Sequence, residues 1–156
     1  VLLFAVERGL RQILLDEYPN AVFYSVLSPV TAHFCELSHF GNNRKLYVYV
    51  YDGKLCIEAF DRGRLLFENE FMHDDSIRNI VYYISYVWKT LAFDQSVDQL
   101  YLVGVHGDYK KELSDELKHF FQFVFYINPS SEFNQASLSQ SVDIPYDVQT
   151  LLVYGI

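Results

Sequence analysis

The chain has 156 residues, of which 51% are apolar, 17% aromatic and 21% charged, and this composition excludes a disordered tail. Its 12 basic and 20 acidic residues give a net charge of −8, which opposes nucleic acid as a partner because phosphate binding needs a basic surface. No apolar run reaches the ~18–20 residues of a membrane-spanning helix, so we expect no membrane insertion.

The cysteines and the first residue indicate the setting of the protein. Cys35 and Cys56 are too few for a disulfide scaffold or a cysteine-rich zinc site, which predicts a reducing, cytoplasmic location. The chain begins at Val1 and its only methionine is Met72, so we expect it to be a piece of a longer protein.

The first part of the chain, residues 1–38, predicts alternating strands and helices. Apolar runs at 2–6 and 21–26 are expected to form strands. Between them, residues 7–18 have the spacing of an amphipathic helix, which Pro19 ends. The apolar face of this helix would consist of Leu10, Ile13, Leu14 and Tyr18.

A helix beginning at Ser28 and Pro29 and a polar stretch lead into three aromatic-rich runs at 45–51, 54–60 and 64–71. These runs predict three consecutive antiparallel strands. The two connections are Asp52-Gly53 and Asp61-Arg62-Gly63, and Asp-Gly is typical of a tight hairpin turn because glycine tolerates positive φ.

Tyrosines mark one face of the first of these strands. Alternation with period two places Tyr47, Tyr49 and Tyr51 side by side. We expect them to pack beneath a helix with their hydroxyls at a polar rim; an aromatic wall for a partner or ligand is the alternative.

The remaining elements complete an α/β unit. A helix is expected from Asp74 or Asp75 to Ala92, with Tyr82, Tyr83, Tyr86 and Trp88 distributed nearly all round it. It is therefore covered on two sides, or part of it meets another lobe or protein. A strand at 98–104, a helix at 109–120 that turns Leu113, Leu117 and Phe120 inward, and a strand at 121–127 follow.

From residue 45 the order is β-β-β-α-β-α-β, which predicts a mixed five-stranded sheet flanked by helices. Polar residues 128–143 are expected to form a loop. The last residues predict a terminal helix, with a strand at 150–154 as the alternative.

Several stretches carry a resemblance to a known family, and they are 18–24, 45–55, 61–71, 74–93, 101–104 and 117–125. In order and texture they resemble an uncharacterised Bacteroidetes family, a domain of unknown function with the actin-like ATPase fold built from ribonuclease H-like units. Members of that family are longer. The resemblance therefore implies that 1–38 is the C-terminal part of a first actin-like subdomain and that 39–156 is the second, ribonuclease H-like subdomain. It implies a fold and no activity.

The resemblance raises nucleotide binding, because actin-like ATPases hold phosphate with two hairpin turns and organise Mg²⁺ with an acidic residue. Small residues in such a turn let backbone N–H groups close on phosphate oxygens. Here Asp52 and Gly53 are followed by Lys54, Leu55 and Cys56, whose bulk obstructs that approach. We therefore interpret Asp52-Gly53 as a plain tight turn.

A second glycine-containing segment, 103–108, lies between a predicted strand and a predicted helix, where open α/β sheets bind ligands. In actin-like ATPases a glycine pair there lies against the nucleotide, but Val105 and His106 separate Gly104 from Gly107 here. A sterically permissive turn explains both glycines equally well. If a nucleotide binds, we expect contacts from Asp52, Gly53, Gly104 and Gly107.

Other chemistries have weaker support. A ribonuclease H-type nuclease needs converging carboxylates for two metal ions, and Glu58, Glu68 and Glu70 show no evident convergence. The five histidines lack metal-ligand spacing, so we predict neither catalytic residues nor a metal site.

Two functional hypotheses follow. The favoured one is a non-catalytic interaction or scaffold protein on a degenerate actin-like ATPase fold, without a cofactor, whose partner is another protein or a second lobe of the same protein. The alternative is an actin-like ATPase or switch that binds ATP with Mg²⁺ and whose first phosphate turn precedes this chain.

Overall fold

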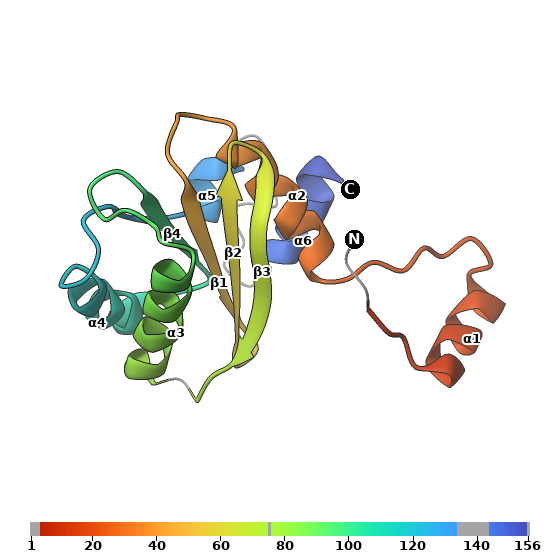
Figure 1. The fold of residues 1–156 in the computed structure, drawn as a ribbon. Helices are drawn as coiled ribbons and strands as arrows, with labels where there is room; N and C mark the ends of the chain where they lie inside the picture. Colours follow the sequence, from red (N-terminus) through yellow and green to blue (C-terminus); the bar gives the residue numbers. More distant parts are fainter. Residues whose placement is uncertain (1–3, 75, 134–143, 156) are drawn as a thin grey trace.

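A computed structural model describes residues 4–74, 76–133 and 144–155 of the chain (Figure 1). Its centre is a five-stranded sheet in the order β3-β2-β1-β4-β5. The strands are β1 (Lys45–Tyr51), β2 (Lys54–Asp61), β3 (Arg64–Met72), β4 (Gln99–Val103) and β5 (Val124–Tyr126). β1, β2 and β3 are antiparallel neighbours, whereas β4 pairs in parallel with both β1 and β5. The predicted mixed α/β sheet is therefore confirmed.

One face of the sheet is aliphatic and is covered by α3 (Ile77–Thr90) and α4 (Gly107–Leu117) (Figure 1). Its core includes Leu46, Val48, Ile80, Ile84, Leu100, Leu102 and Leu113. Trp88 is buried there, while Tyr82 and Tyr86 on the outer side of α3 are exposed. The prediction that Phe120 points inward is wrong, because α4 ends at Leu117 and Phe120 lies exposed beyond it.

The opposite face is aromatic and is covered by α2 (Leu27–Ser38) and α6 (Tyr146–Tyr154). Its core includes Phe34, Tyr47, Tyr49, Phe60 and Tyr146. The rings of Phe34 and Tyr47 stack with centroids 4.4 Å apart. The tyrosines of β1 thus pack beneath helices, as the alternation predicted.

The end of the chain confirms the terminal helix and excludes a strand at 150–154. The buried side of α6 consists of Tyr146, Gln149 and Thr150, so the apolar side of this helix, including Leu152, faces outward. Within the predicted loop, residues 129–132 form the short helix α5 (Pro129–Glu132), because Asn128 caps it through Ser130 N. The rest of that prediction, 134–143, lies outside the described residues.

The N-terminal part departs most from expectation. α1 (Arg8–Glu17) forms as predicted, with the Glu7 carboxylate accepting hydrogen bonds from Gly9 N and Leu10 N. Residues 4–6 and 21–25 form no strand, and residues 1–3 lie outside the described part. A strand needs a hydrogen-bonded neighbour, and none of the described residues supplies one to these segments. Figure 1 shows α1 projecting away from the sheet on the side of α2 and α6.

Candidate functional site

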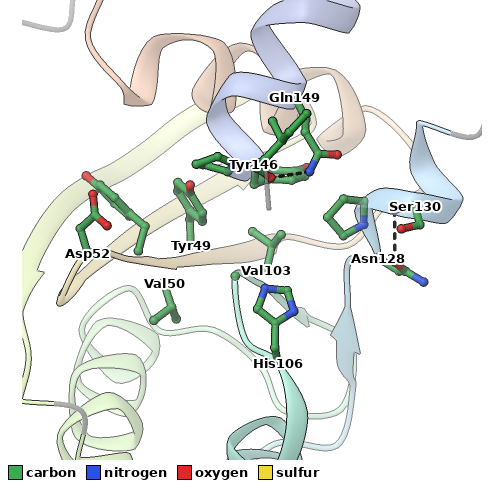
Figure 2. Close-up of a pocket in the computed structure, with 14 residues that line it drawn as sticks. Tyr49, Val50, Asp52, Val103, His106, Asn128, Ser130, Tyr146 and Gln149 are labelled. Atoms are coloured by element: carbon green, nitrogen blue, oxygen red, sulfur yellow. Dashed lines mark hydrogen bonds between the residues drawn. The ribbon is translucent and has the colours of Figure 1, made fainter. Parts of the chain in front are cut away.

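A cavity of about 340 Å³ opens at the carboxyl ends of β1 and β4. Four segments of the chain line it (Figure 2). They are residues 49–52, the residues Val103, Gly104 and His106 after β4, residues 128–130, and the residues Ile144, Pro145, Tyr146 and Gln149 at the start of α6. The carboxyl ends of parallel strands are the usual ligand position in open α/β sheets. This cavity is therefore our candidate site, and its volume is at the lower end of the ~300–1,000 Å³ typical of ligand pockets.

Of the four residues predicted to contact a nucleotide, Asp52 and Gly104 line the cavity together, and Gly53 and Gly107 do not. Asp52 and Gly53 have φ values of 44° and 68°, as in a two-residue type I′ hairpin turn. The Gly53 carbonyl accepts a hydrogen bond from His73 N at 3.0 Å, which holds the turn against the chain after β3. The tight turn expected at Asp52-Gly53 is therefore present.

Steric crowding by the neighbouring backbone requires glycine at position 104. Its φ is +85°, and a Cβ atom built on it would lie 2.0 Å from the Val50 carbonyl oxygen. The backbone of β1 therefore approaches β4 too closely for any side chain at this position. Gly107, by contrast, has a φ of +57° with open space around the position of a Cβ atom.

Aromatic side chains fill the wall of the cavity next to the Asp52 turn. Tyr49 and Tyr51 stack with ring centroids 4.6 Å apart, and Tyr146 lies 5.7 Å from Tyr49. The Tyr49 hydroxyl donates a hydrogen bond of 2.8 Å to Asp147 Oδ1, and burial raises its pKa. The phenol is therefore a permanent donor at neutral pH, and it ties β1 to the first turn of α6.

Charge is sparse at this cavity. Asp52 is the one acidic side chain among the described residues that line it, and His106 stands after β4. Across the described residues no group of three or more His, Cys, Asp or Glu side chains is placed to hold a metal ion. The residues present thus fit poorly to a magnesium-bound triphosphate, which needs several oxygen ligands and unobstructed backbone N–H groups.

Sequence reasoning missed the contribution of α6. Gln149 is buried; its Nε2 donates to the Ile144 carbonyl at 2.6 Å, and its Oε1 has no hydrogen-bond partner among the described residues. Tyr146 packs on Tyr49 from a helix almost one hundred positions away in sequence. Local spacing carries no signal for such contacts, because the tertiary fold alone brings α6 to the strand ends.

A second polar cluster lies beneath α2, on the same aromatic face. The Glu58 carboxyl is buried; its Oε1 accepts from Thr31 Oγ1 at 3.0 Å, and its Oε2 is unpaired within the described chain. Burial, followed by repulsion from Glu68, raises the pKa of Glu58 to about 8. These two carboxyls are opposite each other in the β2–β3 register, a convergence that the sequence analysis did not foresee.

Comparison with known proteins identifies the family. Residues 1–124 match the model of a protein family of unknown function, DUF3822. The chain belongs to this family. No curated protein sequence matches it.

Among solved structures, a Bacteroides thetaiotaomicron protein with an actin-like ATPase fold and unknown function is 35% identical to this chain, with a TM-score of 0.77. The match covers 94% of this chain and 51% of that one, so this DUF3822 chain spans about half the length of its relative. The actin-like ATPase fold implied by the resemblance is thereby supported. An Aquifex aeolicus member of the Ppx/GppA family gives 12% identity and a TM-score of 0.37 over 58% of this chain and 36% of that one.

None of the helices in the described ranges combines the length and apolar character needed to traverse a bilayer. The division of the chain into subdomains at residue 38 stays a prediction. α2, on the N-terminal side of that division, packs against α6 and β2.

Proposed function

We propose that this DUF3822 chain is a non-catalytic interaction protein whose actin-like scaffold no longer accommodates nucleotide phosphates. One observation carries the proposal: the turn and strand end at which we infer that the fold would place phosphate are lined by the stacked rings of Tyr49 and Tyr51 and by Tyr146. Rings in this position exclude the close backbone approach that a phosphate turn requires.

The scarcity of oxygen ligands for a metal ion supports the same proposal. Mg²⁺ demands near-octahedral oxygen coordination, commonly with one or two protein carboxylates. Asp52 offers a single carboxylate from a tight turn, and Cys56 in the β2 strand that follows is a buried thiol whose pKa is raised by that burial. A buried neutral thiol is a poor magnesium ligand.

Exposed apolar surface supports a partner of protein type. Leu10 and Ile13 on α1, Tyr18 directly after it, and Leu152 on α6 are large apolar side chains that are more than half exposed in the described chain. Contiguous exposed apolar surface marks interaction sites in many proteins. Two free thiols, Cys35 and Cys56, are in keeping with a cytoplasmic setting for this interaction.

Thermal unfolding with and without Mg-ATP tests the proposal. A ligand at about 100 times its Kd stabilises a protein by about 2.7 kcal/mol, which raises the Tm of a domain of this size by about 5–10 °C. We expect no rise beyond that given by Mg²⁺ alone. A rise that Asp52→Ala abolishes and Asp61→Ala preserves would contradict the proposal, since Asp61 precedes the turn between β2 and β3 and lines no part of the cavity.

The alternative function, an ATP-binding switch, is favoured by one feature, the position of the cavity at the ends of β1 and β4 with Asp52 and Gly104 in its lining. In that case the adenosine side would bind here and the first phosphate turn would belong to sequence that precedes this chain. The same titration with adenosine in place of Mg-ATP distinguishes the two, because only the alternative expects stabilisation by the nucleoside.

A further inference from the structure

We propose that a second cavity of this protein binds an aromatic monocarboxylate. In this site the ammonium group of Lys45 binds the carboxylate, and the planar body of the ligand packs on the edges of the Tyr47 and Tyr101 rings. The inference goes beyond the proposed function, because it concerns a cavity other than the one at Asp52 and a ligand without phosphate.

The second cavity lies on the aromatic face of the sheet and has a volume of about 600 Å³, which is within the ~300–1,000 Å³ typical of ligand pockets. Lys45 and Tyr47 on β1 and Gln99 and Tyr101 on β4 line it. These residues are direct partners in the parallel register, Lys45 with Gln99 and Tyr47 with Tyr101, and the period of two places all four on the same side of the sheet.

Lys45 is a buried cation without a carboxylate partner. Its side chain lines the cavity although the residue is only 4% exposed, and its Nζ donates to the Leu37 carbonyl at 2.9 Å and to the Phe40 carbonyl. An ammonium group has three N–H donors, so one remains for a ligand. The two carbonyls follow from the C-terminal end of α2, whose partial negative charge offsets only part of a full positive charge.

The preceding residue shows the contrast. Arg44 is paired with the carboxylate of Asp98, with 2.7 Å between Nη2 and Oδ2, whereas Lys45 forms no ion pair with any of the described residues. Burial lowers the pKa of Lys45, as is usual for an ammonium group whose charge is not offset by a nearby carboxylate. An anion in the cavity would supply the missing opposite charge.

The floor of the cavity favours a planar, apolar ligand body. The rings of Tyr47 and Phe125 are both 5.1 Å from the Tyr101 ring between centroids, at interplanar angles of 23° and 25°. Since β4 lies between β1 and β5, the three rings form a row across the sheet. A planar group above this row meets ring edges, which are electropositive and attract the face of another aromatic ring.

The charges around the cavity favour one negative charge on the ligand and oppose two. Glu132 is the one acidic residue among the described residues that line the cavity, and its oxygens are held by His33 at 2.8 Å and by the Tyr146 hydroxyl at 3.2 Å. A single ammonium beside this carboxylate, in a chain of net charge −8, suits a monocarboxylate better than a phosphate dianion. A free acid and the C-terminal residue of a peptide both offer this chemistry.

Calorimetric titration tests the proposal with indole-3-acetate and its neutral counterpart, indole-3-acetamide. We expect a Kd below about 1 mM for the acid and binding of the amide that is weaker by about tenfold or more, because only the acid forms a charge-assisted hydrogen bond. A tetrapeptide that ends in a tryptophan with a free carboxylate distinguishes the two sources of ligand. Tighter binding of the peptide than of indole-3-acetate would assign the site to a peptide terminus, and weaker binding would assign it to a free acid.

Variants locate the two parts of the site. Lys45→Met should abolish the difference in affinity between acid and amide, whereas Tyr101→Leu should weaken both by about threefold or more and preserve their ratio. Lys111→Met is the matched control, because Lys111 is an exposed lysine on α4, at the opposite face of the sheet, and should leave both affinities unchanged.

Nuclear magnetic resonance of the unaltered chain decides the position of the ligand even if Lys45→Met fails to fold. Indole-3-acetate should shift the amide signals of Lys45 and Tyr101 and leave that of Asp52, in the first cavity, in place. Four results would overturn the proposal: no binding at about 1 mM, equal affinities for acid and amide, shifts confined to Asp52 and its neighbours, or an unchanged acid-to-amide ratio in a folded Lys45→Met variant. The Mg-ATP titration reports on the first cavity and can fail or succeed independently of these.

Discussion

The two faces of the sheet bury different kinds of side chain. Beneath α3 and α4 the face is built from aliphatic side chains such as Leu102 and Ile84, which are fully buried and need no polar partners. Beneath α2 and α6 the face is built from tyrosines and contains buried polar groups, each of which needs a hydrogen-bond partner. The two faces therefore differ in the number of buried side-chain hydrogen bonds that link their elements.

Those contacts connect distant elements. His33 Nε2 on α2 lies 2.8 Å from Glu132 Oε1, and the Tyr146 hydroxyl donates to the other oxygen of Glu132 at 3.2 Å. Tyr49 donates to Asp147, and Thr31 donates to Glu58. The candidate cavity lies at the strand ends, and Tyr49, Tyr51 and Tyr146 of this face form part of its lining. The aromatic face therefore carries buried polar contacts between elements that are distant in sequence.

The largest expected effect concerns the point where the two faces meet at the end of β4. Gly104→Ala should abolish folding or cost about 5 kcal/mol, because the new methyl would lie 2.0 Å from the Val50 carbonyl oxygen at a φ of +85°. Gly107→Ala is the control, since its Cβ meets open space and only backbone strain of about 1 kcal/mol remains. Urea unfolding measures both, and similar losses in the two variants would remove the steric explanation of Gly104.

The aliphatic face is tested by Leu102→Ala. Leu102 is fully buried, so loss of its side chain should lower the free energy of unfolding by about 3–4 kcal/mol, independent of pH. Leu65→Ala on the exposed side of β3 should cost less than about 1 kcal/mol. Chemical denaturation at pH 5 and pH 8 gives both numbers. If the loss of unfolding free energy in Leu102→Ala changed with pH, it would contradict the expected difference between the two faces.

The aromatic face is tested by Glu58→Gln, with an effect of opposite sign. Burial and the neighbouring Glu68 raise the pKa of Glu58 to about 8 from 4.5. Below pH 4.5 this carboxyl is neutral in both states and contributes fully; as the pH rises toward 8 the unfolded state alone ionises, and stability is lost. The glutamine variant stays neutral, so at pH 7 it should exceed the wild type by about 3 kcal/mol and at pH 4 equal it.

The unfolding free energy of both proteins across pH 4–8 decides this point. Glu68→Gln is a useful companion, because it removes the neighbouring carboxylate and should reduce the pH dependence by a smaller amount. A Glu58→Gln variant that is less stable at every pH would mean that the ionised carboxylate has a partner on this face.

The sequence predicted the sheet because its signals are local. Alternation in 45–51 and the Asp52-Gly53 turn depend on neighbouring residues only, and both are present in the structure. The strand at 21–26 was predicted from an equally good local pattern and does not form, since a strand depends on a partner that local pattern cannot supply. The connection at Asp61 also differed slightly: Asp61 belongs to β2, and the turn is Arg62-Gly63.

The sequence predicted some of the residues that line the candidate site and not others. Asp52 and Gly104 are turn residues at strand ends, and topology places strand ends together. Tyr146 and Gln149 come from a helix whose apolar pattern pointed to its opposite, outward side, so no periodicity argument could have placed them at the cavity. Glu58 was misjudged for a related reason, because burial of a carboxyl is decided by α2 packing over β2 and leaves no mark in the strand itself.

The smallest effect addresses whether the aromatic face depends on its hydrogen bonds or on its rings. Tyr49→Phe keeps the ring contacts with Tyr51 and Tyr146 and removes the donor to Asp147, which should cost about 1 kcal/mol. Asp147→Asn and the double variant complete a thermodynamic cycle, and a coupling energy of about 1 kcal/mol would assign that loss to this one contact. If the coupling were near zero, the rings alone would hold α6 over the sheet, and the aromatic face would differ from the aliphatic one in shape but not in specificity.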